Sequence, residues 1–214
     1  MAAPGKRKAM QTTAVERPAQ IRALASPARQ ELLDTLQALG RASVPELAAQ
    51  LGRPADALYY HVRALQKAGL LREVERRRRG RHVEAVYATP EPDKRLKLSY
   101  RAGGKASARA VSSVVASMLR ASRRDFDAAI ARADVAVDGP RRELWAARVK
   151  GWLSPRELAR ANTLLLELAT LVSGSRSPAR ERLYSFQFLL APTLRERPAR
   201  RSRRATPIDS GETT

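Results

Sequence analysis

A chain of 214 residues with 43% apolar residues is long enough to bury one large or two small hydrophobic cores. It contains no cysteine and only two histidines, His61 and His82, which excludes disulfide bonds and thiolate metal sites, and we expect neither a metal nor a cofactor. The formal net charge of +20, carried by 34 Arg and 7 Lys against 21 acidic residues, favours a polyanion such as nucleic acid as partner, although an Arg-rich composition can also follow from a GC-rich genome.

Both ends of the chain are polar and lack a hydrophobic period. Residues 1–16 and 195–214 are therefore predicted to be disordered tails, the second beginning with the Arg-rich run RERPARRSRR. Such a run is usually a solvated tail, and the alternative is a nonspecific phosphate-binding arm. No stretch approaches the roughly 18 apolar residues of a membrane helix, and no apolar segment follows the start MAAPGKRKAM. We expect a cytoplasmic, nucleoid-associated protein that does not contact a membrane.

Residues 17–92 contain three predicted helices, each followed by a glycine. The first covers residues 27–39, where a serine N-cap precedes a proline at the first helical position. The sequence SVPE at residues 43–46 is a capping box that begins a second helix of barely two turns. The third helix covers residues 54–68.

A basic hairpin is predicted after the third helix. In LLREVERRRRGRHVEAVYATP, Val83, Ala85 and Tyr87 alternate as residues of a strand do, and RRRRGR forms the hairpin tip. Three helices with a very short second one, followed by a hairpin, are the parts of a winged helix-turn-helix. In that architecture the third helix lies in the major groove, and the hairpin tip contacts the DNA backbone or the minor groove.

The third helix has a polar face opposite its apolar one. At about 100 degrees per residue, Leu58, Val62 and Leu65 point to the core and the opposite side faces outward. The DNA-binding residues predicted on and before this helix are Arg53, Asp56, Ala57, Tyr59, Tyr60, Arg63 and Lys67. Arg53 is the best candidate for a bidentate contact with guanine, whereas Arg63 and Lys67 are better placed for phosphates. Which tyrosine touches the duplex is left open, and His61 is interpreted as a boundary residue of the core.

The hairpin tip concentrates positive charge around one glycine. A charge run is usually a solvated turn, but here the fold independently predicts a phosphate or minor-groove contact. The predicted contact residues are Arg76, Arg77, Arg78, Arg79 and Arg81. For His82 a wing contact and a solvated position are both open.

Three stretches between residues 22 and 90 carry a family resemblance: LASPARQELLDTL, ELAAQLG and ALYYHVRALQKAGLLRE. Their order and spacing resemble the ArsR-like (arsenical-resistance repressor-like) winged-helix transcription regulators. The resemblance implies a homodimeric DNA-binding repressor or regulator. Its recognition surface would contain Arg53, Asp56, Ala57, Tyr59, Tyr60 and Arg63. Metal-sensing members use cysteine or histidine clusters, which this chain lacks, so metal regulation is not implied.

The second half, residues 93–194, is predicted as helix, strand, helix, strand. The long first helix carries an apolar stripe, and its predicted dimer contacts are Val111, Val115, Met118 and Phe126; the alternative is an intramolecular core helix. The strands are ELWAARVKGWL and LYSFQFLLAP, separated by a helix that begins at the capping box SPRE. Their aromatic residues favour a local core over a pocket for a small-molecule effector.

The predicted fold class is mainly α with small β: an N-terminal winged helix-turn-helix domain followed by an α+β dimerisation or effector region. The chain lacks G-x-S-x-G, Walker A, G-x-G-x-x-G and H-E-x-x-H motifs, so we expect no enzyme activity. The predicted function is sequence-specific binding of double-stranded DNA. The alternative is a nonspecific nucleoid-associated or RNA-binding basic protein.

Overall fold

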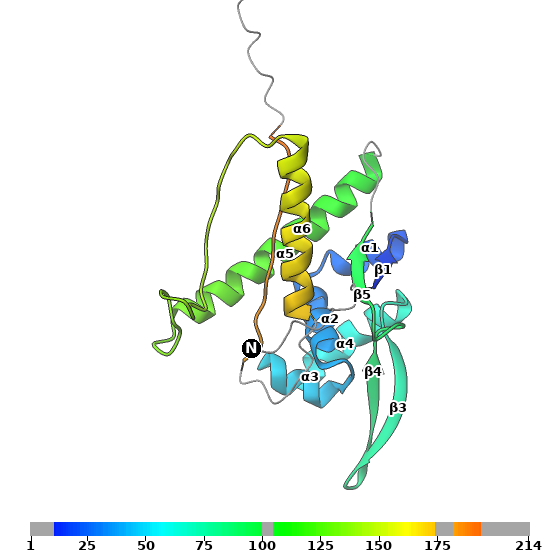
Figure 1. Ribbon diagram of the computed structural model, residues 1–214. Coiled ribbons are helices and arrows are strands. Elements are labelled where there is room, and N and C mark those ends of the chain that lie inside the picture. Colours follow the sequence, from blue (N-terminus) through cyan, green and yellow to red (C-terminus); the bar gives the residue numbers. More distant parts are fainter. Residues whose placement is uncertain (1–10, 100–104, 174–181, 194–214) are drawn as a thin grey trace, which may run out of the picture.

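The computed structural model describes residues 11–99, 105–173 and 182–193 (Figure 1). The Arg-rich run after residue 194 therefore lies outside the described residues. The helices are α1 (Pro18–Leu24), α2 (Pro27–Leu39), α3 (Val44–Leu51), α4 (Ala55–Lys67), α5 (Lys105–Ile130) and α6 (Pro155–Ser173). The strands are β1 (Thr12–Val15), β2 (Ala42–Ser43), β3 (Arg72–Arg79), β4 (His82–Ala88) and β5 (Arg95–Leu98).

Helices α2 to α4 and strands β2 to β4 confirm the predicted winged helix-turn-helix order. The capping box at the start of α3 is present: the Ser43 amide donates to Glu46 Oε2 at 2.7 Å, and the Glu46 amide donates to Ser43 Oγ at 3.4 Å. The helix ends at Gly52, whose φ of 60° lies in the left-handed region that favours glycine. These local signals fix where the short α3 begins and ends.

The hairpin of β3 and β4 projects well beyond the helices (Figure 1). The three-stranded sheet has the order β2-β4-β3 with antiparallel pairing, and Arg79 lies opposite His82. The tip is thus the two-residue turn of Gly80 and Arg81, where Gly80 has a φ of 61°. An irregularity in the register between Glu73 and Glu75 lies near the base of the hairpin.

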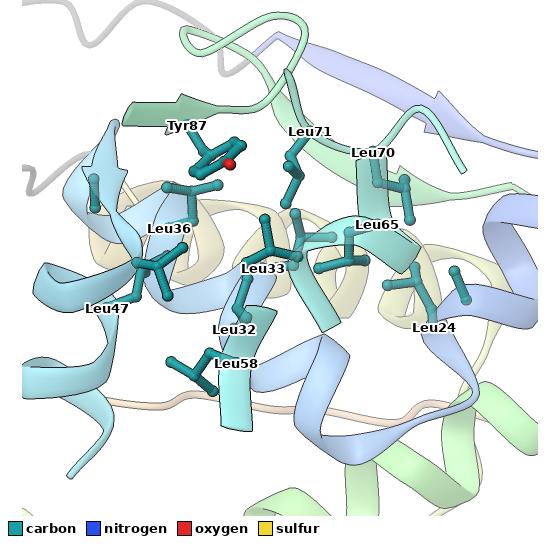
Figure 2. Close-up of a cluster of buried hydrophobic side chains, with 14 of the residues drawn as sticks. Leu24, Leu32, Leu33, Leu36, Leu47, Leu58, Leu65, Leu70, Leu71 and Tyr87 are labelled. Carbon is teal, nitrogen blue, oxygen red and sulfur yellow. The ribbon is translucent and has the colours of Figure 1, made fainter. Parts of the chain in front are cut away.

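One buried cluster holds α2, α3, α4 and the base of the hairpin together (Figure 2). Its fully buried leucines are Leu32, Leu36, Leu47, Leu58, Leu65 and Leu70. Each such side chain contributes about 1.5–3 kcal/mol relative to an exposed position, so this cluster is the main source of stability for the N-terminal region. Leu58 and Leu65 come from α4, which fixes its rotation and turns its polar face outward.

Two elements at the N-terminal end were not expected from the sequence. Residues 12–15, assigned to a disordered tail, form β1, which pairs in parallel with β5. The sequence analysis missed this strand because its partner lies some eighty residues later in the chain. Val15, the last residue of β1, is only 1% exposed. The short helix α1 follows, with Ile21 and Leu24 buried.

The core continues past residue 92, where the sequence analysis placed a domain boundary. Helix α5 packs on α1 and α2, and Val114 belongs to the same buried cluster as the leucines of the N-terminal region. The buried Gln30 side chain of α2 donates to the Val114 carbonyl at 2.9 Å. The face of α5 that contains Val114, Ser117 and Ala121 is thus an intramolecular one.

Most described side chains in the remainder of the C-terminal half are exposed to solvent. Residues 143–153 and 183–192, predicted as strands, are extended but join no sheet with any other described segment. Their aromatic residues, expected to form a local core, are exposed instead: Trp145, Trp152, Tyr184, Phe186 and Phe188. Apolar alternation specified an extended conformation, but no strand edge of the described chain lies in position to pair with it.

Candidate nucleic-acid interface

Helix α4 presents the outward face that its sequence predicted. Leu58, Val62 and Leu65 are buried, whereas the opposite side is solvent-exposed over its whole length. The exposed residues of the predicted set are Asp56, Ala57, Tyr59, Tyr60, Arg63 and Lys67. A polar, partly basic face with no protein covering it in the described residues is the geometry that a major-groove helix needs.

The two tyrosines of α4 differ in exposure. Tyr60 is 70% exposed and Tyr59 is 41% exposed. The Tyr60 ring meets the His61 ring edge-on at a centroid distance of 5.4 Å. At the base of the wing, burial raises the pKa of Tyr87, with further contributions from Glu73 and Tyr59. Tyr60 is therefore the more exposed of the two tyrosines.

Arg53 precedes α4 but does not project freely. It is half-buried, and its Nη2 atom lies 2.6 Å from Glu31 Oε2 on α2. The same carboxylate oxygen accepts a hydrogen bond from Arg124 Nη2 of α5 at 3.0 Å. Glu31 thus connects the start of α4 to the long helix α5 of the C-terminal half. Sequence reasoning did not find this carboxylate, because it lies 22 positions before Arg53.

The wing arginines fall into two groups. Arg76 Nε is 2.7 Å from Glu73 Oε1, and Arg77 Nη1 is 2.9 Å from Glu46 Oε1. Both charges are therefore partly neutralised within the protein. The other three form no ion pair with any described residue and are exposed at the hairpin tip: Arg78, Arg79 and Arg81.

The bond between Arg77 and Glu46 joins the wing to the capping box of α3. The pKa of Glu46 lies below its usual range, first because the Ser43 amide donates to the carboxylate and further because of the Arg77 charge. Glu46 therefore stays ionised at neutral pH. The wing is held at a fixed position relative to the helix-turn-helix by this contact and by the pairing of β2 with β4.

His61 lies at the boundary of the core, as predicted. Burial lowers its pKa, and the charges of Arg29 and Arg53 lower it further, so the imidazole is neutral at physiological pH. Its Nδ1 atom is buried and has no hydrogen-bond partner among the described residues. His82 is exposed at the start of β4.

The predicted dimer contacts on α5 are half-buried beside the intramolecular face of that helix. These residues are Val111, Val115, Met118 and Phe126. Leu119 and Ile130, farther round the same helix, are exposed. The stripe is thus wide enough to pack on α1 and α2 with one edge and to leave another edge accessible.

The helix-turn-helix domain family matches residues 24–74, from the end of α1 through α4 into β3. No curated protein matches the sequence. Within the described residues, no helix combines the length and apolar character needed to cross a bilayer, and no three metal-ligating side chains are grouped together. The family match and the exposed face of α4 identify residues 24–74 as the helix-turn-helix domain of a DNA-binding transcription regulator.

Proposed function

We propose that the chain is a sequence-specific repressor of the ArsR-like kind that binds double-stranded DNA as a homodimer. Helix α4 enters the major groove, and the wing, residues 76–82, lies on the adjacent backbone or minor groove. The observation that carries this proposal is the exposed polar face of α4, followed in the chain by a hairpin whose tip bears three arginines that form no ion pair with any described residue.

The two regions of this interface have different tasks. Asp56, Ala57 and Tyr60 lie in the first turns of α4, where a recognition helix meets base edges. Arg63 and Lys67 lie farther along, at the height of the phosphates. Arg53 contacts a guanine after it leaves Glu31, since a guanidinium can bond guanine O6 and N7 together.

The wing supplies affinity that does not depend on sequence. Each arginine that neutralises a phosphate releases a condensed counterion, and this makes binding stronger at low salt. Arg78, Arg79 and Arg81 are the wing residues available for this task, because Arg76 and Arg77 are already paired with glutamates.

Selection of bound sequences from a pool of random duplex DNA, at two salt concentrations, tests the proposal. We expect enrichment of an inverted repeat and a preference of roughly 10³ or more over random duplex at physiological salt. A nonspecific nucleoid or RNA-binding protein would instead enrich no sequence and would lose affinity equally for all duplexes as salt rises. That result would refute the regulator function.

A further inference from the structure

The C-terminal half exposes many large apolar side chains. Helix α6 has a single buried residue, Ala169, among those described. Its exposed apolar side chains include Leu164, Leu168, Leu171 and Val172, which recur at spacings of three and four residues and form one stripe. Large exposed apolar patches of this kind mark interaction sites.

The extended segments beside α6 expose apolar side chains too. In residues 143–153, Trp145 is 68% exposed, Val149 is 92% exposed and Trp152 is 85% exposed. In residues 183–193, the side chains on both faces are exposed, with Tyr184, Phe186, Phe188 and Leu190 on one face and Leu183 and Leu189 on the other. A segment that is apolar on both faces needs covering on both.

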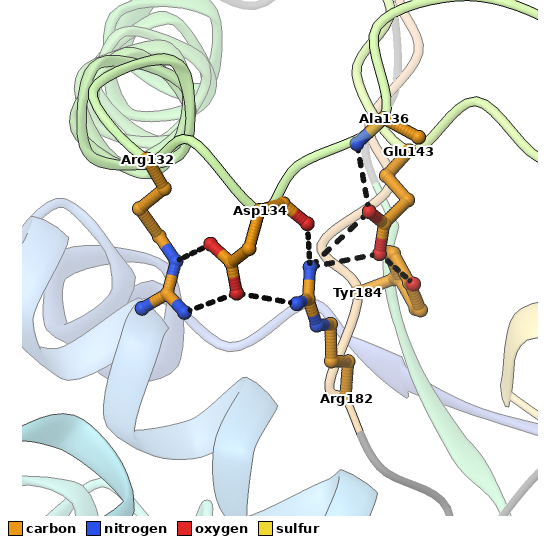
Figure 3. Close-up of polar contacts among 6 residues, drawn as sticks. All are labelled: Arg132, Asp134, Ala136, Glu143, Arg182 and Tyr184. Atoms are coloured by element: carbon orange, nitrogen blue, oxygen red, sulfur yellow. Dashed lines mark hydrogen bonds and ion pairs between the residues drawn. The ribbon is translucent and has the colours of Figure 1, made fainter.

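The two extended segments begin at one fixed point (Figure 3). Arg182 Nη2 lies 2.7 Å from Asp134 Oδ2, and its Nη1 lies 3.0 Å from Glu143 Oε1. The Tyr184 hydroxyl donates to the same Glu143 carboxylate at 2.5 Å. Hydrogen bonding from Arg132 lowers the pKa of Asp134 to about 2, so its charge is present at neutral pH. These contacts orient residues 183–193 at their start, and Ser122 of α5 bonds Gln187 midway along them.

The exposed area is of the size that a stable dimer buries. A fully buried aromatic side chain removes about 150–250 Å² from water. Of the aromatic residues, Tyr184, Phe186 and Phe188 lie in residues 183–193, and with between 37% and 52% of each still exposed they offer roughly 200–300 Å². The exposed leucines of α6 and of residues 183–193 bring the total to about the 800 Å² per partner of a standard interface.

The charge distribution indicates what covers this surface. The chain as a whole carries +20, so two copies repel each other over most of their surface. Residues 183–193 contain no charged residue, and α6 balances Arg156 and Arg160 against Glu157 and Glu167. Within the described part of the chain, this neutral, apolar surface is therefore a place where a second copy approaches at little electrostatic cost, whereas an acidic partner would prefer the basic surface.

We propose that α6 and residues 183–193 dock on the same elements of a second copy, and that residues 183–190 become a strand there. Two-fold symmetry places a segment antiparallel to its own mate, and this segment brings no like charges together. The predicted strand is then a correct assignment whose ladder partner belongs to the other copy. This inference deepens the homodimer of the proposed function by naming the surface that forms it.

The mass of the full chain in solution, measured by light scattering at micromolar concentration, tests the interface. We expect twice 23.6 kDa for the wild type and 23.6 kDa for Leu164→Glu, whose side chain lies on the exposed stripe. Leu166→Glu is the matched control, because Leu166 is 63% exposed but lies on the other side of α6. We expect it to remain a dimer. A monomeric wild type, or a Leu164→Glu chain that stays dimeric, would overturn the proposal.

Hydrogen exchange of the backbone amides in residues 183–190 tests the strand. In the wild-type dimer we expect protection of alternate amides, as in a ladder, and loss of that protection in Leu164→Glu while the amides of α2 and α4 stay protected. Fast exchange of the segment in the wild-type dimer would refute the strand. Both experiments contain no DNA, so a dimer that selects no DNA sequence would refute the proposed function and leave this interface standing.

Discussion

At the scale of single residues, the contact that decides how Arg53 acts is its bond to Glu31. Releasing Arg53 to DNA requires breaking a charged hydrogen bond of 2.6 Å. In Glu31→Gln that bond is weaker, so we expect operator affinity to rise by about 1 kcal/mol, roughly five-fold, with the same preferred sequence. Arg53→Ala should instead cost about 1–3 kcal/mol and flatten the preference at one base position. Titration of labelled operator variants measures both effects.

The two variants also distinguish a base contact of Arg53 from a purely structural role. If Arg53 served only to fasten α4 to α2, then Glu31→Gln and Arg53→Ala would lower the melting temperature alike and would weaken all sequences alike. Local sequence could predict that Arg53 lies at the start of the recognition helix, because caps and periodicity are local. It could not predict Glu31 as partner, since that pairing depends on how α2 packs against α4.

At the scale of elements, two adjacent arginines of the wing differ in whether they form an ion pair. Arg78 has no ion-pair partner among the described residues, whereas Arg77 lies 2.9 Å from Glu46 Oε1. We expect Arg78→Ala to lower the slope of log affinity against log salt by about one, because one phosphate contact is lost. Arg77→Ala should change the slope less. Binding isotherms at several salt concentrations, on operator and on random duplex, provide the comparison.

Equal slope changes for the two variants would show that Glu46 releases Arg77 on binding, and no change for Arg78→Ala would remove that residue from the interface. The sequence predicted this hairpin and its position correctly, because strand alternation and the glycine at the tip are local signals. It treated the five arginines as equivalent, since alternation cannot reveal that Glu46 of α3 lies against one face of β3. The pairing of β1 with β5 escaped prediction for the same reason, as it joins segments far apart in the chain.

At the scale of the whole molecule, the sequence analysis predicted strands in residues 143–153 and 183–192, where the structure has extended segments outside any sheet. It expected these strands to complete a fold within one chain, whereas they remain unpaired in the described residues. Alternation specifies a strand but not whose strand it pairs with. In the proposed dimer, the distance between the two α4 helices depends on how the two copies pair, which no pattern within a single chain specifies.

That dependence leads to a prediction about DNA spacing. A two-fold dimer held through α6 and residues 183–193 keeps its two α4 helices at a fixed separation, which suits half-sites whose centres are one helical turn, about 34 Å, or a multiple of it apart. Inserting about five base pairs between the half-sites turns one of them to the opposite side of the duplex, so only one α4 can bind. We expect the wild type to lose roughly 10²-fold in affinity or more, since binding of the second half-site is no longer intramolecular.

Leu164→Glu, as a monomer, should bind both spacings with the same weak affinity. If the wild type bound both spacings equally, the two helix-turn-helix domains would be acting independently, and the rigid two-fold arrangement would be wrong even if the protein were dimeric in solution.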